Sequence, residues 1–175
     1  MNSGSVVIRI ATTADIPSLA GVQLRSALAG FAHIYPESIP KPTQQSLEEE
    51  WSGLLAHPNL AIVVATVDGE TVGAAAFGAD TTDAYGTDAV LLKLYLTPEY
   101  AGKGIGGLLH DRAIADLVEA GHQRVRLWVL ERNILARRMY ERRGWRLQHW
   151  SRSDFPGSGI LEVGYVLELP HSSAM

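Results

Sequence analysis

The chain has 175 residues, 46% of them hydrophobic, which is enough to bury one sizeable core and suits a single domain over residues 1–175. A net charge of −4 gives no general attraction to nucleic acid or anionic membranes, so cationic partners fit better than polyanions. The absence of cysteine excludes disulfides, thiolate nucleophiles and cysteine-based metal sites. No segment resembles a signal peptide or a bilayer-spanning helix, and we expect a cytoplasmic protein.

The first half of the chain predicts one strand, two helices and a pair of strands. Asp15-Ile16-Pro17 is a typical helix start, and Asp68-Gly69 is a typical turn of a β-hairpin. The expected segments are a strand at 6–11, a helix from 15 onward, a loop or broken helix at 27–42, a helix at 46–56, and strands at 60–67 and 71–79.

The second half alternates strands with helices after a polar, acidic connection at 80–88. The sequence at 124–130 alternates apolar and polar residues with the period of a strand. The expected segments are a strand at 90–96, a glycine-rich turn at 98–107, a helix at 108–118, a strand at 124–130, a helix between Asn133 and Gly144, and strands at 145–150 and 160–169.

Three glycines occupy every second position in the turn Gly102-Lys103-Gly104-Ile105-Gly106. This pattern predicts consecutive backbone N–H groups that face one concavity, at the start of a helix whose unpaired N–H groups and dipole attract anions. A phosphate or pyrophosphate is therefore the expected ligand. A nucleoside-triphosphate loop does not fit, because glycine rather than Ser or Thr follows Lys103.

A dinucleotide fingerprint is a competing interpretation of the same turn. Gly102, Gly104 and Gly107 match its spacing, and Glu131 stands where a ribose-binding acid could lie. The context disfavours it, because residues 97–101 separate the strand from the first glycine and only about 70 residues remain for the rest of a doubly wound sheet.

A second motif begins at Asn133, which stands at the expected N-cap of the last helix. It reads Asn133-x-x-Ala136-x-x-x-Tyr140-x-x-x-Gly144-Trp145, and it follows the glycine turn after one intervening helix and strand. The two motifs together, over about residues 89–150, resemble the GCN5-related N-acetyltransferase (GNAT) superfamily. The order of elements on both sides of them also fits that superfamily.

The resemblance implies an α/β fold with a mixed, mostly antiparallel sheet of roughly six to seven strands, flanked by about four helices. It implies a central strand that splays from its neighbour to form an acetyl-CoA cleft. The expected activity is direct transfer of an acetyl group from acetyl-CoA to a primary amine of a small molecule or peptide. A non-catalytic acyl-CoA-binding sensor on the same fold is the alternative. No metal is expected, since the histidines lack metal-ligand spacing.

The resemblance also assigns residues to the coenzyme. Backbone in the glycine turn would bind the pyrophosphate, and backbone on the central strand would pair with the pantetheine arm. Asn133 would bind pantetheine or only cap its helix, and Tyr140 would protonate the CoA thiolate or only pack in the core. The expected coenzyme residues are Leu94, Leu96, Ala101, Gly102, Lys103, Gly104, Ile105, Gly106, Asn133 and Tyr140.

The sequence leaves the identity of the general base open, because Val90 stands where many members of the superfamily carry a glutamate. Asp88 lies two residues earlier on the same face of the strand and is the substitute that we favour. Asp83, a water chain, or an amine that arrives neutral are alternatives. Catalytic roles are thus expected for Tyr140 and Asp88.

The acceptor side is less defined. Tyr35 and His33, from the loop after the first helix, would line the acceptor pocket or simply pack. The carboxylates Asp80, Asp83 and Asp88 favour a small or flexible cationic amine, with a solvated polar loop as the alternative. We expect an amine substrate and no nucleic-acid or membrane partner, and the sequence leaves a homodimer open.

Overall fold

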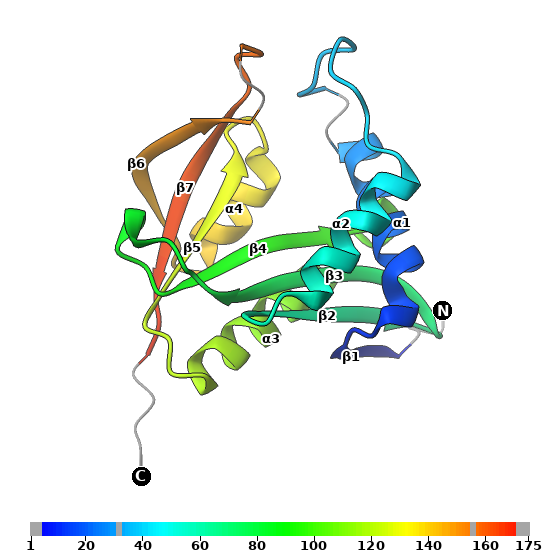
Figure 1. The fold of residues 1–175 in the computed structure, drawn as a ribbon, viewed down its shortest axis with the longest axis horizontal. Helices are drawn as coiled ribbons and strands as arrows, with labels where there is room; N and C mark the ends of the chain where they lie inside the picture. The colour runs from blue at the N-terminus through cyan, green and yellow to red at the C-terminus, as the bar shows by residue number, and fades with distance from the viewer. Residues whose placement is uncertain (1–4, 31–32, 155–156, 171–175) are drawn as a thin grey trace.

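The computed structural model describes residues 5–30, 33–154 and 157–170. Its strands form one seven-stranded sheet in the order β1-β2-β3-β4-β5-β7-β6 (Figure 1). The strands are β1 Val6–Ile10, β2 Leu60–Val67, β3 Glu70–Ala79, β4 Ala89–Leu96, β5 Arg124–Leu130, β6 Arg146–Ser153 and β7 Leu161–Glu168. The helices are α1 Ile16–Gly30, α2 Gln44–Ala56, α3 Ile105–Glu119 and α4 Ile134–Arg142, with 3₁₀ turns at η1 Thr13–Asp15, η2 Asp83–Tyr85 and η3 Pro98–Tyr100.

The predicted fold class is confirmed. Every neighbouring pair of strands is antiparallel except β4 and β5, which are parallel. Helix α1 continues to Gly30, past the point where a loop was expected, and α3 begins at Ile105 because Gly104 serves as its N-cap. In the described part of the chain, no helix combines the length and apolar character needed to cross a bilayer.

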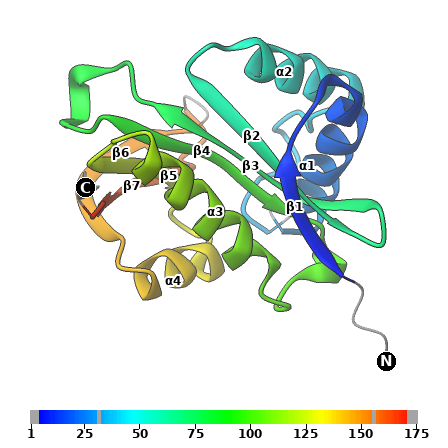
Figure 2. The ribbon, with the colours of Figure 1, turned by 90° about the horizontal axis from the view of Figure 1, so that it is seen from below.

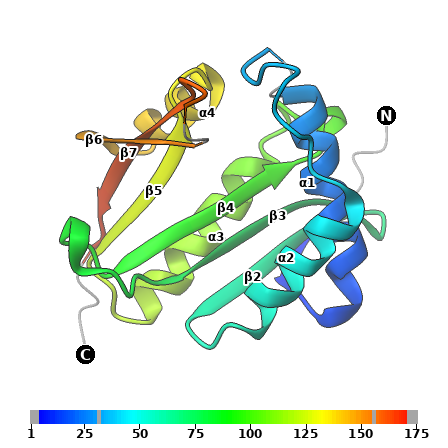
Figure 3. The same ribbon diagram turned by 45° about the horizontal axis from the view of Figure 1, so that its top comes forward.

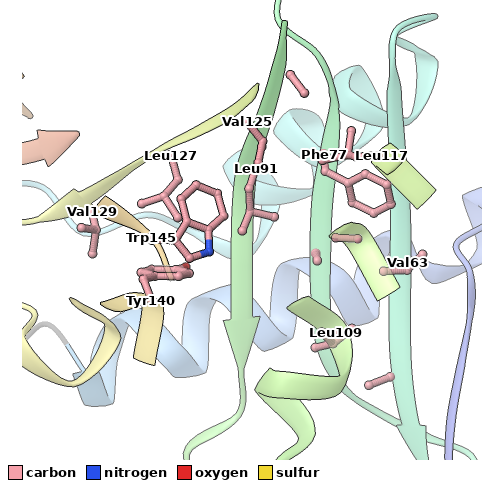
Figure 4. Packing of buried hydrophobic residues seen from close by; sticks show 14 of the residues in the cluster. Val63, Phe77, Leu91, Leu109, Leu117, Val125, Leu127, Val129, Tyr140 and Trp145 are labelled. Atoms are coloured by element: carbon pink, nitrogen blue, oxygen red, sulfur yellow. The ribbon is translucent and has the colours of Figure 1, made fainter. Parts of the chain in front are cut away.

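The helices cover both faces of the sheet (Figure 2). Because side chains alternate along a strand, Ile62 and Val64 of β2 face α1 and α2, whereas Val63 and Ala65 face α3. Trp51 of α2 is fully buried on the first face. The larger core on the second face extends from α3 to Tyr140 and Trp145 beyond it (Figure 4).

The sheet splits in the middle. Strands β4 and β5 pair only at Ala89 with Val125 and at Val90 with Arg126, and then diverge (Figure 3). Strand β4 also carries a bulge, since Ala76 of β3 faces Lys93 whereas the next residue, Phe77, faces Leu91. A bulge bends a strand and increases its twist. The far edge of β4 beyond Val90 therefore has no strand partner in the sheet.

Candidate active site

The divergence of β4 and β5 opens a cleft of about 190 Å³. Its two walls come from β4 and β5, and α4 and the start of β7 contribute further side chains. The lining residues are Tyr35, Leu91, Leu92, Lys93, Leu94, Tyr95, Leu127, Trp128, Val129, Leu130, Asn133, Ala136, Tyr140, Asp154 and Glu162. The cleft thus brings Leu94, Asn133, Tyr140 and Tyr35 together, as the sequence predicts. Leu96 lies farther along β4, paired with Gly73, and is not part of this lining.

The glycine turn adopts a conformation suited to an anion. Gly102 and Gly104 have φ angles of 75° and 83°, and a Cβ added at either would meet no atom within 4 Å. The open space and the exposure of residues 101–104 leave the backbone accessible to a ligand. The first N–H groups of α3 have no partner within the helix, and Gly104 supplies no side-chain cap.

The side chains of this turn have different roles. Ile105 is 2% exposed and packs in the core, so only its backbone faces the turn. Lys103 is exposed, with its Nζ 4.8 Å from the centroid of the Tyr100 ring. Ala101 has an extended backbone and ends the 3₁₀ turn η3. The residues present fit a pyrophosphate, because backbone donors, a helix dipole and one nearby cation converge there.

Arg143, at the end of α4, brings a second cation to the first turn of α3. Its guanidinium occupies the space beside Gly107, where an added Cβ would clash with it. Its Nε also lies 3.4 Å from Asp111 Oδ1. Its guanidinium therefore lies close to the first turn of α3.

Tyr140 lies on the cleft side of α4 and is 7% exposed. Burial raises the pKa of its hydroxyl, so the phenol is a neutral proton donor at physiological pH. Its ring packs at 64° to the Trp145 ring, with centroids 5.7 Å apart (Figure 4). Trp145 is held in turn by a hydrogen bond of 2.9 Å from its Nε1 to His110 Nε2.

Asn133 caps α4, as predicted from the sequence. Its Oδ1 accepts a hydrogen bond of 3.2 Å from the Ala136 N–H. The side-chain amide group also lines the cleft. Because the cap uses the oxygen, the NH₂ donors remain available for a ligand, and capping and ligand binding are compatible.

Asp88 does not lie in the cleft lining, which corrects the expectation that it faces the reacting groups. Its carboxylate accepts hydrogen bonds from the backbone N–H groups of Gln123, at 2.9 Å, and Arg124, at 2.8 Å. It sits at the closed end of the divergence, just before the β4–β5 pairing at Ala89. The position supports a structural role in joining the strands and gives no support to a role as base.

In the acidic connection at 80–88, the carboxylate of Asp80 is already paired. The Asp80 side chain is 2% exposed and forms an ion pair with Arg126 of β5. Hydrogen bonds from Thr82 and Thr87 add to this pairing. Burial alone would raise the pKa of Asp80, but the hydrogen bonds from Arg126 and Thr82 outweigh it and lower the pKa to about 2. Asp80 is therefore committed to the fold, and the Asp83 side chain lies outside the described part of the structure.

Two carboxylates that the sequence did not single out line the cleft instead. Asp154 follows β6 and Glu162 lies on β7. Asp154 accepts a short hydrogen bond from the Tyr35 hydroxyl, whereas Glu162 pairs with Arg152 at 2.6 Å. In the described ranges, Asp154 has no cationic partner within ion-pair distance. In the sequence, Asp154 only follows one expected strand and Glu162 only lies within the next, and the pairing of β7 with β5 brings both to the cleft.

His33 lies outside this cleft, in a neighbouring cavity of about 310 Å³ that shares Tyr35 with it. Of the two expected acceptor residues, Tyr35 thus lines both the cleft and the cavity, whereas His33 lines only the cavity. In the described part of the chain, no group of three or more His, Asp or Glu side chains is arranged to hold a metal ion.

Comparison with known proteins agrees with this geometry. The model of the acetyltransferase (GNAT) family matches residues 26–145. An uncharacterized N-acetyltransferase from Mycobacterium tuberculosis is 33% identical over 137 residues, which cover 76% of this chain and 84% of that protein. An uncharacterized N-acetyltransferase from Archaeoglobus fulgidus is 28% identical over 121 residues, which cover 65% of this chain and 82% of that protein.

Solved structures show the same fold. The PaiA N-acetyltransferase from Thermoplasma acidophilum, in complex with coenzyme A, is 25% identical with a TM-score of 0.71, covering 91% of this chain and 98% of that one. An acetyltransferase from Thermus thermophilus is 23% identical with a TM-score of 0.74, covering 97% of this chain and 100% of that one. The chain therefore belongs to the acetyltransferase (GNAT) family, and its enzyme class is that of the acetyl-CoA-dependent acetyltransferases.

Proposed function

We propose that this protein transfers the acetyl group of acetyl-CoA directly to a primary amine of a small molecule or peptide. The observation that carries the proposal is the cleft between β4 and β5, with the anion-binding turn of α3 near one end and Tyr140, Asn133 and Asp154 in its lining. Bound acetyl-CoA supplies the reactive thioester. The protein supplies binding, orientation and two proton-transfer groups.

The backbone from Ala101 to Gly106 is the proposed pyrophosphate site, with Lys103 adding charge. The unpaired edge of β4 around Leu94 and Leu96 offers backbone groups to the pantetheine arm, in the manner of an added strand. The NH₂ group of Asn133 is a further donor on the opposite wall.

Tyr140 is the proposed general acid. Its burial keeps the hydroxyl protonated, and no hydrogen bond within the described residues engages that hydroxyl. It can therefore give its proton to the departing sulfur and regain one from solvent. Asp154 replaces Asp88 as the proposed base, because it is the cleft carboxylate without a cationic partner and can accept a proton from the amine nitrogen.

The experiment is a thiol-release assay with acetyl-CoA and a panel of primary amines. Because the chain contains no cysteine, a thiol reagent reports only the CoA that is released. We expect Tyr140→Phe to lower kcat by about 100-fold while acetyl-CoA still stabilises the protein. Asp154→Asn should also lower kcat, whereas Asp68→Asn, a matched change at the exposed β2–β3 turn, should not.

Two outcomes would contradict this function. Saturable binding of acetyl-CoA without CoA release for any amine would favour the acyl-CoA sensor. Equal kcat for the wild type and Tyr140→Phe would leave Tyr140 with a packing role only.

A further inference from the structure

A second cavity adjoins the acceptor end of the cleft. It has a volume of about 310 Å³, and Tyr35 lines both this cavity and the cleft. Its base is a small apolar cluster in which Ile34 and Ile160 pack with Leu130 at the end of β5. The cavity lining consists of His33, Ile34, Tyr35, Pro36, Arg132, Ser158, Gly159 and Ile160.

The charge of this cavity is opposite to that of the cleft mouth. Among the described residues, its lining contains Arg132 and no carboxylate. The lining of the adjoining cleft contains Asp154, which has no cationic partner among these residues. The other charged groups of that lining are already paired, Glu162 with Arg152 and Lys93 with Glu50. An acceptor that spans both would meet an anionic group at one end and a cationic group at the other. This arrangement matches a zwitterion better than a polyamine.

Arg132 is free to bind a ligand. Its guanidinium makes no hydrogen bond or ion pair with the residues at 5–30, 33–154 and 157–170. Two arginines nearby are already engaged: Arg137 donates to the Tyr165 hydroxyl at 3.0 Å, and Arg152 pairs with Glu162. Arg132 directly precedes Asn133 at the end of β5, so its backbone is fixed by the same turn that caps α4.

We propose that this cavity binds an oxyanion on the acceptor, and that the acceptor is a primary amine linked to a carboxylate. The inference rests on the proposed acetyl transfer and names its substrate class. Arg132 binds the carboxylate, for which the planar guanidinium offers paired donors, and the amine lies toward Asp154. This class of acceptor replaces the purely cationic amine expected from the sequence, because Asp80 is already paired with Arg126 and is not free to attract a cation.

The test compares acceptors that differ only at the far end. Straight-chain ω-amino acids, from glycine upward, are each paired with the alkylamine and the diamine of the same length, and CoA release is measured. At the best length we expect the amino acid to have the highest kcat/KM and the diamine the lowest. Arg132→Gln should lower kcat/KM for that amino acid by about 10- to 100-fold, which corresponds to about 1.4–2.8 kcal/mol and to the loss of a hydrogen bond to a charged group.

The controls separate charge recognition from general damage. Arg132→Gln should leave kcat/KM for the alkylamine unchanged, and Arg132→Lys should retain part of the preference for the amino acid. Arg138→Gln, an exposed change on α4 outside both cavities, should behave as the wild type for every acceptor.

The outcomes distinguish this inference from the function on which it rests. If amines are acetylated but the diamine is preferred, or Arg132→Gln lowers kcat/KM equally for the amino acid and the alkylamine, the carboxylate site is wrong and the acetyltransferase stands. If acetyl-CoA binds and no amine releases CoA, the proposed function itself fails, and the substrate class fails with it.

Discussion

The ion pair between Asp80 and Arg126 should stabilise the fold without affecting the acceptor. Replacing Asp80 with Asn removes the negative charge and leaves the Arg126 side chain, which is 11% exposed, without a counter-ion. The native pKa of Asp80 is about 2, against an ordinary value of 3.8, which corresponds to about 2.5 kcal/mol at neutral pH. We therefore expect Asp80→Asn to lower the free energy of unfolding by about 2–4 kcal/mol, since breaking a buried pair also strands its partner.

The pH dependence follows from the direction of the shift. Because folding lowers the pKa of Asp80, its contribution is fully present well above pH 3.8 and is lost as the pH falls through about 2. Urea titrations at pH 7 and at successively lower pH should show the difference between wild type and Asp80→Asn shrinking in that window. Thermal unfolding at pH 7 should shift by roughly 5–15 °C.

The same variant separates two roles for the acidic connection. If Asp80 only supports the fold, the KM for the acceptor and its salt dependence should match the wild type wherever Asp80→Asn is folded. Asp68→Asn, an equal loss of charge at an exposed turn, is the matched control and should change stability by less than about 0.5 kcal/mol. Equal stability of Asp80→Asn and Asp68→Asn would refute the reasoning, as would a large rise in acceptor KM in Asp80→Asn alone.

Three further predictions concern coenzyme binding and the strand junction. Gly104→Val places a β-branched residue at φ 83°, so it should destabilise the protein by about 1–3 kcal/mol. It should also reduce the thermal stabilisation by acetyl-CoA. Gly53→Val on α2 is the control for both measurements. Because the Arg143 guanidinium lies beside the first turn of α3, we expect it to contact the phosphates of CoA. Arg143→Gln should then raise the KM for acetyl-CoA several-fold but leave that for S-acetylpantetheine, which lacks the nucleotide phosphates, nearly unchanged. Equal effects on both would contradict this contact. Asp88→Asn should lower the free energy of unfolding by about 1 kcal/mol, because it weakens the hydrogen bonds that the carboxylate accepts from backbone N–H groups, while kcat stays near the wild-type value. A large loss of kcat in the folded variant would instead support Asp88 as the base.

The conformation of the glycine turn could be predicted from the sequence because its determinants are local. A glycine turn followed by a helix positions its own N–H groups whatever surrounds it, and Gly102 and Gly104 do adopt positive φ. The cap at Asn133 likewise depends on residues three positions apart. The mixed, mostly antiparallel sheet followed from the resemblance of these motifs to a known family, and the order of elements along the chain agreed with it.

The acceptor side could not be predicted, because its contacts join residues far apart in the chain. Asp80 and Arg126 are 46 positions apart, and Tyr35 and Asp154 are 119 apart. Only the packed sheet decides whether a carboxylate is neutralised by a buried arginine or left in a cleft. The sequence by itself determined the glycine turn and the helix cap, because short-range backbone geometry encodes them, and the family, because two of its motifs are present. The tertiary structure alone decided which acids are paired and which line the cleft, because charge pairing and burial depend on neighbours that only folding brings together.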